Sequence, residues 1–191
     1  MAITYVNRQR KTYYLHVGLT KKGNPKYYLS LSRDGDLADR IPEGFEIHEK
    51  ASGQVVIRRI RPKLITDEEL KVVEHELAKI KEVRRSYAER EGEFIAVYAV
   101  SRNAMLEETI RRIHPLAAQA RIDELVDQFV YYDEVFRFVL TNSEKRIFQA
   151  QRFCYLGSID DWIFIGEEAS LPELAREYLP HINQESYFDL M

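Results

Sequence analysis

The feature that most constrains the fold of this chain is an alternating pattern on both sides of one dense turn. Every second residue from position 13 to 19, and again from 27 to 31, is Tyr, Leu or Val. Residues 21–25 between them read Lys-Lys-Gly-Asn-Pro, and glycine, asparagine and proline all favour tight turns. A period of two places alternate side chains on opposite faces of a strand. The pattern therefore predicts a β-hairpin.

A second hairpin is predicted a little further along the chain. Residues 45–49 would pair with residues 54–60 across Ala51-Ser52-Gly53. Together the two hairpins predict an antiparallel β-meander, a β-rich domain of residues 1–64 with one apolar face. Such a sheet needs a layer over that face, and the next element along the chain is the expected cover.

The next element is predicted to be an amphipathic helix that connects the two halves of the chain. Thr66 and Glu69 have the spacing of a capping box, in which each side chain satisfies a backbone N–H of the other. Apolar residues then recur at helical spacing as far as about Arg90, which predicts a connecting helix over residues 65–92. The stripe consists of Leu70, Val73, Leu77, Ile80 and Tyr87.

Residues 93–191 are predicted to form an α+β domain with a mostly antiparallel sheet, so the fold class expected for the whole chain is α+β. In the second of three consecutive strands, one face is expected to be apolar and to include Cys154 as a small core residue. That face consists of Phe148, Ala150, Cys154 and Leu156. The elements expected are a strand at 94–100, helices at 103–113 and up to 129, strands at 130–140, 146–156 and 162–166, and a helix from Ser170 to Pro180.

Charge is distributed unevenly along the chain, although the net charge is only −3. Residues 1–62 carry 12 Lys or Arg against 6 Asp or Glu, and residues 63–191 carry 16 against 25. Residues 1–33 contain no acidic residue at all. A basic N-terminal domain and an acidic C-terminal domain follow, and the basic segment creates a local positive field.

Several classes of protein are not indicated by the sequence. No apolar run approaches the length of about 18 residues that spans a membrane, and the first residues are polar and basic, so we expect a cytoplasmic protein with no membrane association. The single cysteine and the scattered histidines lack the spacing of metal ligands, and no glycine-rich phosphate loop is present. We therefore assign no catalytic residue, no metal site and no cofactor, and favour a non-enzymatic protein.

The basic hairpin is the one constellation with a positive functional argument. Lysines neutralise phosphates and tyrosines stack on bases, and a two-stranded ribbon also fits the major groove of DNA. We therefore predict a binding protein that contacts nucleic acid through this hairpin. The candidate contact residues are Lys11, Tyr14, His16, Lys21, Lys22, Lys26 and Tyr28.

Two alternatives remain open. The basic face is also typical of a solvated surface, or of one that docks on the acidic C-terminal half of the same chain or of a second copy. A docked face would make the protein a structural or assembly protein, through self-association as a dimer or through a protein partner. The third hypothesis is a metal-dependent enzyme of unknown substrate. Its acids would be Asp160, Asp161 and Glu167, because carboxylates hold hard divalent ions.

Overall fold

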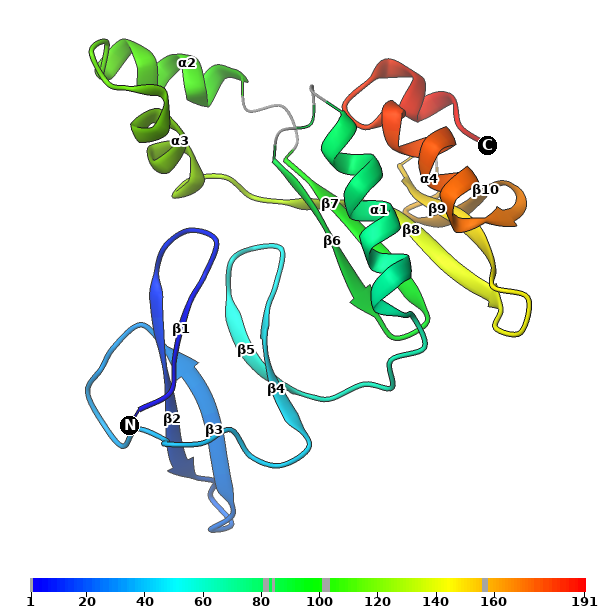
Figure 1. Cartoon of the computed structure of the whole chain (residues 1–191). Helices are drawn as coiled ribbons and strands as arrows, with labels where there is room; N and C mark the ends of the chain where they lie inside the picture. The colour runs from blue at the N-terminus through cyan, green and yellow to red at the C-terminus, as the bar shows by residue number, and fades with distance from the viewer. Residues whose placement is uncertain (1, 81–82, 84, 101–103, 156–157) are drawn as a thin grey trace. The chain divides into compact units, whose positions relative to one another are not determined.

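The computed structural model describes residues 2–80, 83, 85–100, 104–155 and 158–191 (Figure 1). The contacts within the chain group it into two compact units. Unit 1 consists of residues 1–60 and 103–131, and unit 2 of residues 61–102 and 132–191. The fold class is α+β, as predicted, with antiparallel sheets and α-helices in the same chain.

Unit 1 contains the predicted hairpins. Strands β2 (Thr12–Leu19) and β3 (Pro25–Ser30) pair antiparallel, as do β4 (Phe45–Glu49) and β5 (Val55–Arg59). A further strand, β1 (Thr4–Val6), pairs with the start of β2 and was not predicted, because three residues are too short to show a period. The hairpins belong to two separate sheets, β1-β2-β3 and β4-β5, rather than to one continuous meander.

Buried polar side chains connect the two sheets of unit 1. Glu49, only 5% exposed, accepts hydrogen bonds from the backbone N–H of Arg8 and from the Tyr5 hydroxyl. Asn7 donates to the carbonyl oxygen of Gly53 at 2.7 Å. These bonds join the β1–β2 turn to the β4–β5 hairpin, and buried polar groups stabilise a fold when each finds a partner in this way.

Two helices also belong to unit 1. Helices α2 (Ala104–Ile113) and α3 (Gln119–Asp127) pack against each other, and Ile122 and Val126 of α3 are buried. The side chain of Gln9 donates to the carbonyl oxygen of Val130, which connects this pair to the β1–β2 turn. The sequence pattern predicted the two helices, apart from Asn103, which lies outside the described residues, but it grouped them with the C-terminal half of the chain.

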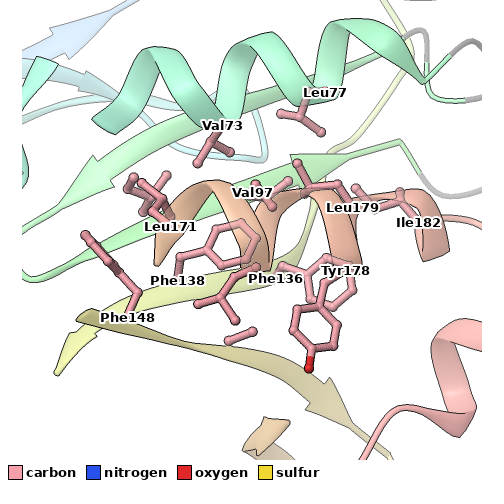
Figure 2. Close-up of a cluster of buried hydrophobic side chains, with 14 of the residues drawn as sticks. Val73, Leu77, Val97, Phe136, Phe138, Phe148, Leu171, Tyr178, Leu179 and Ile182 are labelled. Atoms are coloured by element: carbon pink, nitrogen blue, oxygen red, sulfur yellow. The ribbon is translucent and has the colours of Figure 1, made fainter. Parts of the chain in front are cut away.

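Unit 2 is a five-stranded antiparallel sheet of order β10-β9-β8-β7-β6, with helices α1 and α4 on one face (Figure 1). Its core consists of apolar side chains from the sheet and from both helices, shown in Figure 2. The bounds of its elements are α1 Asp67–Lys79, β6 Ser86–Glu91, β7 Phe94–Ala99, β8 Asp133–Asn142, β9 Ile147–Cys154, β10 Asp161–Ser170 and α4 Leu171–Tyr178, followed by two short 3₁₀ helices at Leu179–His181 and Glu185–Asp189.

The connecting helix is shorter than predicted. The capping box of Thr66 and Glu69 is present, but α1 ends at Lys79, and residues 86–91 form strand β6 instead of the last turns of a helix. Strand β6 pairs with β7 through a tight turn at Gly92, whose φ of 66° suits glycine. This pairing overrides the helical spacing of Tyr87, which stacks on Tyr98 of β7 at 4.7 Å between ring centroids.

Helix α1 also has a different partner from the one predicted. Its buried residues Val73 and Leu77 belong to the core of unit 2 and pack with the sheet and α4, rather than covering the N-terminal strands. The capping box of Ser170 and Glu173 opens α4 as predicted. No helix among the described residues is long and apolar enough to cross a membrane.

Strand β9 places a charged residue, Arg152, among the buried apolar side chains of the core. Phe148, Ala150 and Cys154 are buried on one face as predicted, while Leu156 lies outside the described residues. Arg152 lies on the same buried face and is only 4% exposed. Its guanidinium donates to the carbonyl oxygens of Leu190 and Phe188, so the buried charge is hydrogen-bonded.

Candidate nucleic-acid interface

The β2–β3 hairpin presents its lysines at and beside the turn. Backbone hydrogen bonds from Thr20 to Asn24 and from Gly23 to Thr20 close this turn, and Gly23 adopts the positive φ that it requires. Lys21, Lys22 and Lys26 are all exposed. The turn and the start of β3 therefore carry three exposed lysines at the end of a paired ribbon.

None of these three lysines has a carboxylate partner within the part of the chain that the structure describes. Arginines elsewhere in unit 1 do have such partners. Arg10 pairs with Glu124 at 3.1 Å and Arg58 with Glu46 at 2.9 Å. The positive charge of the hairpin tip is thus not paired with a carboxylate of any described residue.

Tyr28 stands on the same hairpin face as Lys26 and is held in place by a histidine. Its ring stacks on that of His16, with centroids 5.1 Å apart and planes 12° apart. The ammonium group of Lys26 lies 5.9 Å from the centroid of the Tyr28 ring. Gly18 lies opposite Lys26, and a Cβ at Gly18 would be 3.9 Å from Tyr28 Cε1, so the absence of a side chain there leaves room beside the ring. Tyr28 itself is 45% exposed.

His16 lies beneath this surface rather than on it. It is only 2% exposed, and its Nε2 lies 2.9 Å from the carbonyl oxygen of Ser32. Because that carbonyl can only accept, Nε2 carries a proton. The other ring nitrogen, Nδ1, is buried and has no hydrogen-bond partner among the residues that the structure describes.

A loop of residues 32–36 covers His16. After β3 the chain crosses this face to the opposite edge of β2, where Val17 N–H donates to the carbonyl oxygen of Asp36 and Ala38 N–H donates to that of Leu15. Gly35 lies against the histidine, since a Cβ there would be 3.6 Å from Nδ1. The run Arg33-Asp34-Gly35-Asp36 indicated a loop in the sequence, but no period in it shows where a loop crosses.

The remaining candidate residues lie away from the hairpin tip. Tyr14 is half-buried and pairs with Thr4 and Ser30, toward the other end of β2. Lys11 precedes β2 and donates to the side chain of Gln9 at 3.1 Å. Strand β2 has eight residues and spans roughly 26 Å at 3.3 Å per residue, so Lys11 and Lys21 cannot contact the same nucleotide. The structure places Lys21, Lys22 and Lys26 at the turn end of the hairpin and Tyr28 beside His16, whereas Tyr14 lies one pair further from the turn on the same face and Lys11 lies before β2.

The acids of the enzyme hypothesis do not converge. Asp161 begins β10, whereas Glu167 lies in the irregular part of that strand between Ile165 and Ala169. Asp160, Asp161 and Glu167, all within the described residues, do not form a group whose carboxylate oxygens lie within 4.8 Å of one another.

Comparison of the chain with protein-family models, with curated proteins and with solved structures gives no match.

Proposed function

We propose that this chain is a non-enzymatic binding protein that contacts nucleic acid through the tip of the β2–β3 hairpin. The observation that carries the proposal is the group of three exposed lysines, Lys21, Lys22 and Lys26, that have no carboxylate partner among the described residues. Nucleic-acid phosphates are the natural counter-ions for such a group. When lysines neutralise these phosphates, cations condensed on the nucleic acid are released into solution, and this release favours binding.

The acid-free segment supports the same function. Residues 1–33 contain no Asp or Glu, so no carboxylate of the hairpin itself repels a phosphate. Unit 1 as a whole carries 14 Lys or Arg against 11 Asp or Glu, whereas unit 2 carries 14 against 20. A polyanion would therefore be attracted to unit 1, and within it to the hairpin tip.

Fluorescence anisotropy of labelled oligonucleotides tests the proposal. Single-stranded DNA, single-stranded RNA and duplex DNA would each be titrated with the protein at several salt concentrations. If three phosphates are neutralised on a single strand, the logarithm of the association constant falls with the logarithm of salt at a slope of about −2. The triple substitution Lys21→Glu, Lys22→Glu and Lys26→Glu should weaken binding at least about ten-fold at low salt.

A matched control separates the hairpin tip from net charge. Lys63, Lys71 and Lys145 are exposed lysines of unit 2, and their replacement by Glu changes the net charge by the same amount. This control should retain most of the wild-type affinity. Equal loss in both triple variants, or no loss in the tip variant, would show that the hairpin is not the contact surface.

The charge difference between the units favours one second candidate, a self-assembling protein. In it, the hairpin tip of one copy meets acidic residues of unit 2 in another copy. Light scattering at low and high salt tests it, because such an assembly dissociates when its charges are screened. A mass that stays monomeric at both salt concentrations contradicts this candidate.

A further inference from the structure

The ring of Tyr28 has one covered face and one accessible face. The covered face lies on buried His16, with the two planes 12° apart. Tyr28 is 45% exposed, and the ammonium group of Lys26, which lies 5.9 Å from the ring centroid, is carried by a flexible and exposed side chain. Stacking on His16 therefore fixes the direction of the ring before any ligand arrives, which lowers the entropy lost on binding.

A base can use this ring only when it is unpaired. In a duplex both faces of each base are covered by its neighbours, whereas an unpaired base can leave the stack and lie on an aromatic side chain. Duplex DNA would contact Tyr28 only through the edges of its bases or through its sugar-phosphate backbone. A ring oriented for face-to-face contact, beside lysines that neutralise phosphates, thus favours a single strand.

The loop that crosses the hairpin face also favours a single strand, because it leaves only a short part of that face uncovered. Asp34 and Asp36 belong to this loop and are exposed beside His16. The uncovered part of the face, from Tyr28 to the turn, is about three residue pairs or roughly 10 Å long. A duplex laid along the ribbon would bring its phosphates toward both carboxylates, whereas two or three nucleotides of a single strand fit the uncovered part.

We propose, on the basis of the function above, that the hairpin binds single-stranded rather than double-stranded nucleic acid. One unpaired base stacks on the accessible face of Tyr28. The phosphates that flank this base lie near Lys21, Lys22 and Lys26. The buried His16 makes no contact with the ligand and is a positioning residue for Tyr28.

Tyr28 variants test this assignment in the full-length chain. Labelled single-stranded 12-mers of DNA and RNA and the matching 12-base-pair DNA duplex serve as probes in anisotropy titrations. We expect the duplex to bind at least ten-fold more weakly than the single strands. Tyr28→Leu should weaken single-strand binding by about 5- to 150-fold, the range found when one base–aromatic stack is removed. Tyr28→Phe keeps the ring and should bind like the wild type.

Photo-crosslinking gives a second test that needs no substitution, in case Tyr28→Leu disturbs the hairpin. A single-stranded 12-mer with 5-iodouracil should crosslink at Tyr28, within the tryptic peptide of residues 27–33. Equal affinity for duplex and single strands, an unchanged affinity in Tyr28→Leu, or crosslinks only outside this peptide would overturn the inference. The triple lysine variant shows which of the two proposals fails. If it loses binding while the Tyr28 tests fail, the hairpin is still the contact surface and only the single-strand inference is wrong. Absence of wild-type binding to every probe would overturn both proposals.

Discussion

Arg152 Nε donates a hydrogen bond at 2.7 Å to the carbonyl oxygen of Leu190, which ties strand β9 to a segment 38 residues further along the chain. The same guanidinium donates to the carbonyl oxygen of Phe188 at 3.1 Å and lies 5.8 Å from the ring centroid of Tyr187. A buried cation with these partners secures the last described residues against the sheet, because each carbonyl would lack a donor without it.

Replacement of Arg152 by Leu should destabilise unit 2 strongly. The substitution leaves two carbonyl oxygens without a donor, and we expect a loss of about 2–4 kcal/mol in the free energy of unfolding. Urea denaturation followed by the fluorescence of Trp162, the single tryptophan of the chain, measures this in unit 2. Arg176→Leu, at an exposed position of α4, is the control and should change stability by less than about 0.5 kcal/mol. Equal effects at the two positions would contradict this role.

Gly166 and Gly92 allow a steric contact to be separated from backbone strain. Both have positive φ, 61° and 66°, but a Cβ at Gly166 would lie 1.8 Å from the Tyr178 hydroxyl oxygen, whereas none at Gly92 would meet an atom within 4 Å. Gly92→Ala should cost about 1–2 kcal/mol through strain alone. Gly166→Ala should cost at least about 1 kcal/mol more because of overpacking.

Removal of the hydroxyl provides the control for that comparison. Tyr178→Phe should recover part of the stability lost in Gly166→Ala, and thermal denaturation of the wild type, the two single variants and the double variant measures the coupling. Additive effects of the two substitutions would mean that the contact with Tyr178 is not the cause.

Glu69 should make the stability of unit 2 depend on pH. Burial alone would raise the pKa of this carboxyl, but hydrogen bonds from Arg146 and Thr66 and the charge of Arg146 outweigh it, so the pKa is lowered. The Arg146 Nε lies 2.8 Å from Glu69 Oε1. A lowered pKa in the folded state means that ionised Glu69 stabilises the fold above its unfolded pKa of about 4.3, and that this contribution is lost as the pH falls through the folded pKa.

We expect the difference in stability between the wild type and Glu69→Gln to disappear at acidic pH. Glu69→Gln should be less stable than the wild type by about 1 kcal/mol at pH 7, and the two should converge as the pH falls through the lowered folded pKa of Glu69. Urea denaturation across this pH range measures the difference. Glu144→Gln, an exposed carboxylate near the β8–β9 turn, should show no such trend. A constant difference between wild type and Glu69→Gln at all pH values would contradict the ion pair.

His16 should hold the crossing loop in place. His16→Ala removes both the hydrogen bond to Ser32 and the ring under Tyr28, so the loop should open more often. Hydrogen exchange measured by mass spectrometry should show about ten-fold faster exchange for the amides of Val17 and Ala38, with β7 to β9 unchanged. His75→Ala, at an exposed position of α1, serves as the control. Unaltered exchange in residues 12–38 would show that the loop is stable without the histidine.

The parts of the fold that were predictable are those in which local pattern and tertiary pairing agree. The β2–β3 turn and the Ser170–Glu173 capping box combine the right residues at the right spacing, and both are present. Residues 86–91 show the opposite case. Tyr87 fits a helical stripe, but the strand at 94–99 is adjacent across a tight turn at Gly92, and pairing with it decides the structure.

The candidate interface was predictable only in part for a related reason. Alternation placed His16 and Tyr28 correctly on one face of the hairpin. It carried no information about the loop that buries His16, because that contact depends on where the chain crosses after β3. Arg152 likewise occupies an inward position of β9, and only the carbonyl groups near the end of the described chain explain why a cation can be buried there.

The grouping of residues 103–131 with unit 1 makes the helical pair an insertion within the sheet of unit 2. Strands β7 and β8 are direct neighbours, with Ala99 paired to Asp133, yet 33 residues separate these two positions in the chain. The entropy of closing a loop rises only slowly with its length, so the sheet tolerates so long an excursion. A short turn that joins residues 100 and 132 directly should therefore leave unit 2 able to fold. Unit 1, in contrast, cannot be isolated as one continuous stretch of chain, because its residues 103–131 lie in the sequence between strands β7 and β8 of unit 2.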